Sequence, residues 1–298
     1  MVDHLKVVLR DRLTSLAWMS DTTRRQALAK LDAFRTKIGY PDVWRDYSSL
    51  EIEPGPFVAN LRRAAEFETA RRIATISRPV DRTEWQMTPP TVNAYYSPTL
   101  NEIVFPAGIL QPPFFDSAAD DAINYGGMGA VIGHEMTHGF DDRGRQYDAE
   151  GNLRDWWTGG DRERFHARAR LVEQQFSSYI AVDSARVNGK LTLGENIADL
   201  GGLMIAYQAF EHSLVGKPTP PKIDGFTAEQ RFFLAWARIW RGKRRPEFAH
   251  LLVTTDTHSP GQWRANGPLA DIPEFARAFG CRPGDPMVQP DSVRAQIW

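Results

Sequence analysis

The 298-residue sequence contains 42% hydrophobic and 24% charged residues, a composition typical of a globular protein and not of a disordered chain. Its 36 lysines and arginines nearly balance 37 aspartates and glutamates, so no overall positive field draws it to nucleic acid or an anionic membrane. The short basic clusters, such as Arg62-Arg63 and Lys243-Arg244-Arg245, are interpreted as solvated faces. The single cysteine, Cys281, excludes an intrachain disulfide and a cysteine-based zinc cluster. No apolar stretch approaches the ~18–20 residues of a membrane helix, and the first residues do not resemble a signal peptide.

Taken in chain order, residues 1–38 are expected to form two helices, the second with its N-cap at Asp21-Thr22-Thr23. A loop is expected over 40–56, and a helix with one apolar side over 57–77. Residues 85–115 predict a β ribbon with strands near 91–96 and 102–105. Helices are expected over 120–140, 161–181, 194–213 and 227–241. We therefore predict one domain over 1–298, mostly α with a small β element (α+β). Its parts are a helical amino-terminal part (1–80), the ribbon (85–115) and a helical part that carries the chemistry (120–298).

The strongest chemical signal is an H-E-x-x-H motif, which runs from His134 to His138. On a helix, residues i and i+4 share one face, so both imidazoles can reach a single metal ion. Glu135 lies beside them, where its carboxylate can take a proton from a metal-bound water. The alternative is a surface helix with unrelated histidines, but the small and apolar residues 124–132 that precede the motif favour a buried helix.

A third ligand must come from elsewhere, because Gly144 occupies the position of a third histidine in the metzincin pattern. Glu195 and Asp199 stand at i and i+4 in a second helix of small and apolar residues, so one could bind the metal while the other accepts a histidine N–H. Three isolated histidines stay open as ligands, although each is more typical of a surface or core histidine: His166, His212 and His250.

These blocks resemble the neprilysin and endothelin-converting-enzyme family of zinc metallopeptidases, whose catalytic domain is a thermolysin-like gluzincin. The resemblance covers essentially the whole chain and rests on four blocks in the right order: Val92–Tyr96, Ile103–Phe115, His134–Asp142 and Gly194–Gly202. It implies one zinc ion per chain, held by His134, His138 and Glu195, with Glu135 as the general base.

The resemblance also implies roles for residues around the metal. Asp199 and Asp141 would accept hydrogen bonds from the two histidines, and His258 would stabilise the oxyanion. Substrate would be bound by Asn93 and Ala94 on an edge strand and by Arg264 at the carbonyl beside the cleaved bond. A pocket for the residue after that bond would be lined by Ile109, Phe114, Val131, Ile239 and Trp240. For any one of these five, ordinary core packing is nearly as good an interpretation.

The function that follows is a zinc-dependent endopeptidase that cuts on the amino side of bulky hydrophobic residues. Members of this family usually act outside the cytoplasm and are more than twice as long, with an amino-terminal cap over the catalytic part. No cap is present here, so we expect a relaxed limit on substrate size, and a homodimer would cover the apolar surface left open. The cysteine pattern is that of bacterial-type members. Two alternatives stay open: a zinc-stabilised peptide-binding protein or inactive fragment with little turnover, and a hydrolase of another bond.

Overall fold

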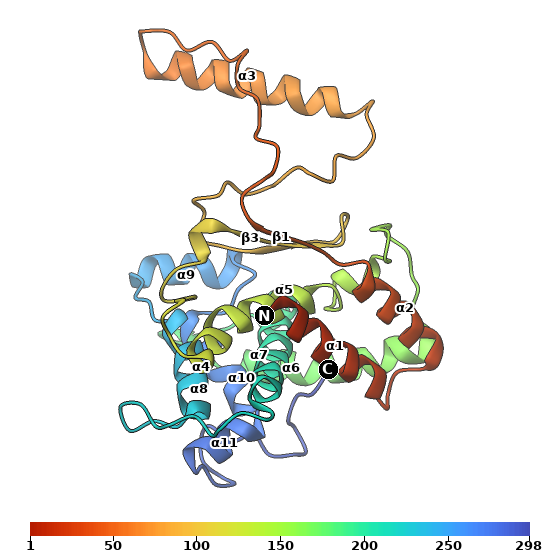
Figure 1. The fold of residues 1–298 in the computed structure, drawn as a ribbon, viewed down its shortest axis with the longest axis vertical. Coiled ribbons are helices and arrows are strands. Elements are labelled where there is room, and N and C mark those ends of the chain that lie inside the picture. Colours follow the sequence, from red (N-terminus) through yellow and green to blue (C-terminus); the bar gives the residue numbers. More distant parts are fainter.

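The computed structural model describes residues 1–298 and shows a helical body beneath a small sheet, with one helix standing apart on a long arm (Figure 1). The prediction of a mostly helical fold with a small β element is confirmed. The helices are α1 (Val2–Ser15), α2 (Asp21–Asp32), α3 (Phe57–Thr75), α4 (Asp121–Asn124), α5 (Ala130–His138), α6 (Gly159–Ser178), α7 (Leu193–Leu214), α8 (Ala228–Ile239), α9 (Pro246–Thr255), α10 (Gly261–Ala270) and α11 (Pro273–Phe279). The strands are β1 (Arg35–Gly39), β2 (Tyr95–Ser97), β3 (Glu102–Pro106), β4 (Ile180–Val182) and β5 (Ala185–Arg186).

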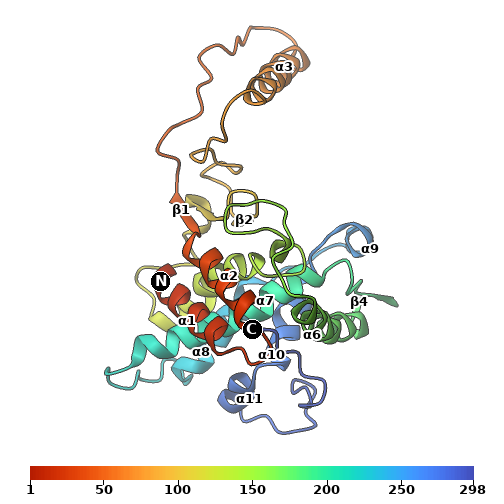
Figure 2. The same cartoon turned by 90° about the vertical axis from the view of Figure 1, so that its right-hand side faces the viewer.

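Helix α7 runs through the centre of the body, and α5 packs along it more extensively than any other element does. Both helices are buried along most of their length because their residues are small or apolar. Helices α1, α6, α8 and α10 surround this pair and share with it one hydrophobic core (Figure 2). A turn of π-helix, Tyr125–Gly129, joins α4 to α5 within what the sequence predicted as one helix over 120–140. Such turns are frequent near functional sites.

The predicted ribbon is present as an antiparallel pair of β2 and β3, and the structure adds a third strand to it. Residues 35–39, predicted as the end of a helix, form β1, which pairs with β3 in parallel. Strand β3 is buried throughout, so it needs a hydrogen-bonding partner on each edge. Lys37 of β1 also forms an ion pair with the fully buried Glu102 (Nζ–Oε2, 2.9 Å). The strand order β1-β3-β2 leaves β2 at the edge of the sheet.

The helix predicted over 57–77 is present as α3, which lies on the arm formed by residues 40–90. None of its residues is buried: Phe57 is 73% exposed and Leu61 is 51% exposed. Its charged residues pair with one another and with the flanking loops, as Arg71 does with Glu68 and Glu84. Both views show the arm well away from the helical body (Figures 1 and 2).

The two ends of the chain meet on the body. The Trp18 indole N–H donates to the carbonyl of Ile297 (3.0 Å), and its ring lies 6.0 Å from that of Trp298. Arg12 of α1 donates to the carbonyl oxygen of Trp298. Trp298 is 3% exposed and lies against α7 at Gly201. The first helix and the last residue therefore belong to the same core as the central helices.

Three further points differ from the sequence predictions. The N-cap of α2 is Ser20, one residue earlier than predicted, and its hydroxyl accepts from the Thr23 N–H. Helix α6 begins at Gly159 behind the Thr158 N-cap. Helices α9, α10 and α11 were not predicted, because their sequences are short and are interrupted by glycine and proline.

None of the helices combines the length and the apolar character that a membrane span requires.

Candidate active site

The close crossing of α5 and α7 brings three potential metal ligands together. His134 and His138 lie one turn apart on α5, and their Nε2 atoms are 3.0 Å apart. Glu195, in the first turn of α7, places its Oε2 atom 3.3 Å from Nε2 of His134 and 3.6 Å from Nε2 of His138. This is the one group of histidine, cysteine and acidic side chains in the structure whose arrangement could hold a metal ion.

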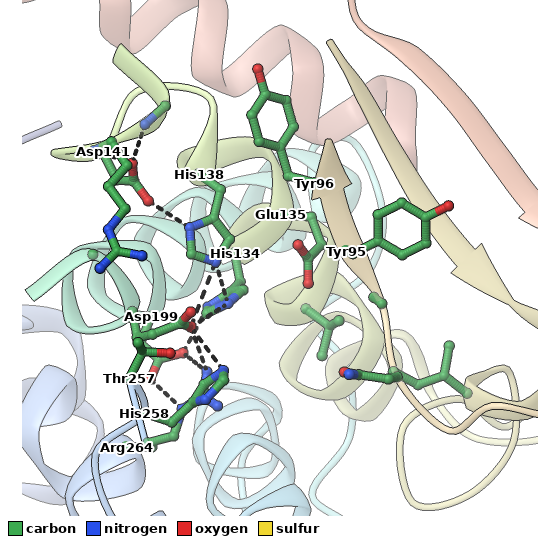
Figure 3. A pocket seen from close by; sticks show the side chains of 18 of the residues that line it. Tyr95, Tyr96, His134, Glu135, His138, Asp141, Asp199, Thr257, His258 and Arg264 are labelled. Atoms are coloured by element: carbon green, nitrogen blue, oxygen red, sulfur yellow. Dashed lines mark hydrogen bonds and ion pairs between the residues drawn. The ribbon is translucent and has the colours of Figure 1, made fainter. Parts of the chain in front are cut away.

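Carboxylates behind the two imidazoles fix which nitrogen faces the cluster. Nδ1 of His134 lies 2.8 Å from Oδ1 of Asp199, and Nδ1 of His138 lies 2.6 Å from Oδ2 of Asp141 (Figure 3). Because each Nδ1 carries the proton that its carboxylate accepts, each Nε2 presents a lone pair to the other and to Glu195. The shared face therefore consists of acceptors only.

This acceptor set fits a zinc ion. The Oε2 atom of Glu195 is buried and has no hydrogen-bond partner, which is costly unless a cation binds it. Zinc prefers nitrogen and oxygen ligands at ~2.0–2.2 Å, and neighbouring ligand atoms of a tetrahedron are then roughly 3.3–3.6 Å apart. The two separations from Glu195, 3.3 and 3.6 Å, agree with that geometry, and the 3.0 Å between the two Nε2 atoms is about 0.3 Å shorter. Without a metal, burial lowers the pKa of His138, but the carboxylates of Asp141 and Glu195 outweigh burial and raise it well above 6.5, so metal binding must displace a proton from this ring.

Glu135 lies beside the ligands and faces the cleft, between the histidines and strand β2 (Figure 3). Glu135 is 5% exposed, and its carboxylate makes no hydrogen bond to the protein. Burial raises the pKa of this carboxyl, while the neighbouring His134 and His138 oppose the rise. A carboxylate with a raised pKa and a free lone pair suits a group that accepts and returns a proton.

His258 reaches the cluster from the loop between α9 and α10. Its Nε2 lies 3.2 Å from Oε2 of Glu195, and its Nδ1 lies 2.8 Å from Oδ1 of Asp256. Asp256 also accepts the backbone N–H of His258 at 2.9 Å, so it holds both the ring and the loop. Burial lowers the pKa of His258, but its contacts with Glu195 and Asp256 raise it above 6.5 overall. This imidazole is therefore placed as a hydrogen-bond donor at the edge of the cleft.

Arg264 is buried in α10 and forms a two-pronged ion pair with Asp199. Its Nε and Nη2 donate to the two carboxylate oxygens at 2.7 Å each. The guanidinium also lies over the ring of Trp240, 3.8 Å from the centroid. Burial raises the pKa of Asp199, but Arg264 more than offsets this effect and the net pKa is lowered. Arg264 therefore keeps Asp199 ionised, and Asp199 in turn orients His134.

These groups line a cleft with a volume of about 500 Å³. Its polar end contains the metal ligands, and its apolar wall consists of Ile109, Phe114, Val131, Trp236 and Trp240. Ile239, which was expected to line the pocket, lies outside the lining and packs against the core. Trp236, one turn before Trp240, lines the wall instead. Asn93 and Ala94 line the opposite side, directly before the edge strand β2, with Asn93 exposed and Ala94 7% exposed.

Two glycines allow α5 and α7 to approach closely enough for the ligands to meet. A Cβ atom on Gly202 would lie 2.3 Å from the backbone nitrogen of His134. A Cβ atom on Gly133 would lie 2.4 Å from the carbonyl oxygen of Gly202. Both contacts are between backbones, which cannot move aside as a side chain can. The absence of side chains at these positions therefore sets the distance from His134 to Glu195.

Sequence reasoning missed several supporting residues. The fully buried Lys30 of α2 donates to the carbonyls of Gly144 (2.6 Å) and Tyr147 (2.7 Å), in the loop that follows Asp141. No local pattern marks this lysine. Asp256 could have been found, because an aspartate in a loop often accepts the backbone N–H two residues further on, here that of His258.

The isolated histidines left open as ligands take no part in the cluster. His166 contacts Arg145, His250 contacts Asp183, and His212 lies in the last turn of α7.

Comparison with known proteins supports this assignment of the cluster. Two models of peptidase family M13 match the chain, one over residues 93–295 and an amino-terminal one over residues 1–41. The two matched segments share one core, and most of the arm lies between them. Mouse endothelin-converting enzyme 1 is 43% identical over 300 residues and the Locusta migratoria homologue is 42% identical over 296 residues, each covering 96% of this chain.

Solved structures agree with the sequence comparison. An inhibitor complex of the Mycobacterium tuberculosis zinc metalloprotease Zmp1 superposes with a TM-score of 0.96 at 49% identity and covers the whole chain. PepO from Lactobacillus rhamnosis does so with a TM-score of 0.90 at 35% identity. The chain spans 38% and 41% of the two curated relatives and 46% of each of these structures. With its gluzincin fold and its His-Glu-x-x-His cluster, the chain belongs to peptidase family M13.

Proposed function

We propose that this chain is a zinc-dependent endopeptidase that hydrolyses peptide bonds on the amino side of bulky hydrophobic residues. The observation that carries the proposal is the convergence of His134, His138 and Glu195 beside a buried, unpartnered Glu135. A protein that only binds peptides has no need of such a base. The membership of the chain in a metallopeptidase family supports the same reading.

The zinc ion, when bound, would supply Lewis acidity and lower the pKa of a bound water. Side chains of the protein carry out the proton transfer and stabilise the developing charge. Glu135 accepts a proton from the attacking water and returns it to the leaving amine nitrogen. His258 donates a hydrogen bond to the carbonyl oxygen as negative charge develops there, which is a contribution of several kcal/mol when the donor is preorganised. Asp256 holds that donor in place.

The substrate would lie between the edge strand and the apolar wall. The free edge of β2 can pair with an extended peptide, and Asn93 and Ala94 continue this edge. Such pairing would align the scissile carbonyl with the cluster. The residue after the cleaved bond would enter the apolar pocket at Phe114, Val131 and Trp240. Arg264, which is committed to Asp199, would offer its remaining N–H groups to the substrate carbonyl.

The first test measures zinc content and digestion of a mixed library of peptides and folded proteins. The variants are wild type, Glu135→Gln and the control Glu163→Gln, which alters an exposed glutamate on α6. We expect one zinc ion per chain in all three proteins. Cleavage before bulky apolar residues is expected for wild type and the control, and a loss of at least 10²-fold for Glu135→Gln.

The main alternative is a zinc-stabilised peptide-binding protein with little turnover. Zinc bound at one per chain, with peptide binding but no cleavage by wild type, would favour that alternative. Cleavage of esters with no cleavage of peptides would instead indicate a hydrolase of another bond. Absence of zinc from the protein would overturn the assignment of the cluster.

A further inference from the structure

Four cations lie unpaired in the segment that leaves the apolar wall of the cleft. Residues 241–245 join α8 to α9 and contain Arg241, Lys243, Arg244 and Arg245, here called the basic rim. All four side chains are exposed, and none forms an ion pair. Some basic residues elsewhere are paired; Arg71, for example, pairs with two glutamates. The exposure of all four side chains agrees with the sequence interpretation of this segment as a solvated face, and its position shows what that face can contact.

The position of the basic rim relates it to the cleft. It begins directly after Trp240, which lines the apolar wall. Its other end leads through α9 to Asp256 and His258. The pKa of Asp256, which burial alone would raise, is lowered by hydrogen bonds from His258 and by the charges of His258 and Arg244. Arg244 is thus within electrostatic reach of the group that holds the donor histidine.

We propose that the basic rim is a specificity element that favours substrates with a carboxylate group two to four residues beyond the cleaved bond. This inference rests on the proposed function, because it takes the wall at Trp240 as the pocket for the residue after that bond. A peptide that continues past this pocket passes the basic rim. The whole chain carries a formal charge of only −1, so this attraction is local and does not come from the overall field.

Two sources could provide the carboxylate: an aspartate or glutamate side chain, or the free carboxyl terminus of a short peptide. Both would make the same exposed charge contact with Lys243 or Arg244. Such contacts are screened by salt and persist from the bound substrate to the transition state, so they change KM more than kcat. A single exposed contact is worth roughly a two- to fivefold change in affinity.

The test compares peptides of one sequence that differ only beyond the cleaved bond. One set carries Asp or Asn at the second and third positions after the bond, and another ends there with a free or an amidated carboxyl group. For wild type at low salt we expect kcat/KM about fivefold higher for the Asp peptide than for the Asn peptide, mainly through KM. The ratio should fall towards one at 1 M salt, where the screening length is about 3 Å.

The K243E/R245E variant, which leaves Arg244 beside Asp256 in place, should bring this ratio to one or below, while cleavage of the neutral peptide stays at the wild-type rate. The matched control K217E/K222E makes the same charge change in the α7–α8 loop, at the opposite end of α8 from the basic rim, and should keep the wild-type ratio. A ratio near one for wild type, or a ratio that K243E/R245E leaves unchanged, would overturn the inference. An effect of the free terminus without an effect of Asp would assign the basic rim to terminal carboxylates. Failure to cleave any peptide would instead overturn the proposed function.

Discussion

The backbone contact between Gly202 and His134 makes a sharp prediction about the metal centre. In Gly202→Ala the new Cβ would lie 2.3 Å from the His134 nitrogen, whereas ordinary contacts begin near 3.4 Å. Helices α5 and α7 must therefore separate by about 1 Å, and Glu195, now 3.3 Å from His134, moves away with α7. Zinc bonds tolerate deviations of only about 0.2 Å, so the three ligands could no longer all reach one ion without strain.

We expect Gly202→Ala to weaken zinc binding by roughly 10–100-fold, as displaced ligands do elsewhere. Its free energy of unfolding should fall by about 1–3 kcal/mol from overpacking, partly offset by up to about 1 kcal/mol of better helix propensity. Zinc affinity would be measured by competition with a chromogenic chelator, and stability by urea unfolding with and without zinc.

The matched control is Gly129→Ala, at the junction with α5, where the nearest atoms belong to the Tyr125 side chain at 3.3 Å. It should leave zinc affinity unchanged and cost little or no stability. Wild-type zinc affinity in Gly202→Ala, within twofold, would refute the idea that this contact sets the ligand spacing.

Three further outcomes are expected. Arg264→Lys keeps the charge but loses the two-pronged contact with Asp199. We expect kcat/KM to fall about tenfold or more while zinc content is retained. An unchanged kcat/KM would contradict the role of Arg264 in positioning Asp199. Burial raises the pKa of Asp271 to about 6. Ionisation of this carboxyl therefore lowers the free energy of unfolding as pH rises from about 4 to above 6. Asp271→Asn should therefore increase the free energy of unfolding by about 3 kcal/mol at pH 8 and by about half of that at pH 5, and equal changes at both pH values would exclude this cause. A chelator should lower the Tm of wild type but not that of His138→Ala, and equal shifts would place the bound metal elsewhere.

The chemical residues of the site could be predicted because they lie in short local patterns. The i, i+4 spacing of His134 and His138 and that of Glu195 and Asp199 place each pair on one helix face whatever the rest of the fold does. How the two helices meet is a tertiary property, and no local pattern gives it. The crossing depends on Gly133 and Gly202 facing each other, which becomes visible only when both helices are placed.

The errors in the fold have the same origin. Residues 35–39 continue a helical pattern, but β3 requires a partner on its second edge, and this pairing overrides local preference. Helix α3 has the right bounds within two residues, yet periodicity alone could not show that its apolar residues lie outside the hydrophobic core and that Phe67 packs against Tyr47 of the arm. Ile239 and Trp236 are three residues apart on α8, and only the placement of this helix decides which of them faces the cleft.

The meeting of the two chain ends has a consequence for how the protein is made. Trp18 bonds to Ile297, 279 residues further on, and Trp298 lies against the central helix behind the ligand-bearing turn of α5. Contacts of such long range close slowly and cannot form until both partners are available. During synthesis, α1 and α2 therefore cannot complete their packing until residues 297 and 298 are available. The part of the core that lies behind the ligand-bearing turn of α5 is thus completed late in the folding of this chain.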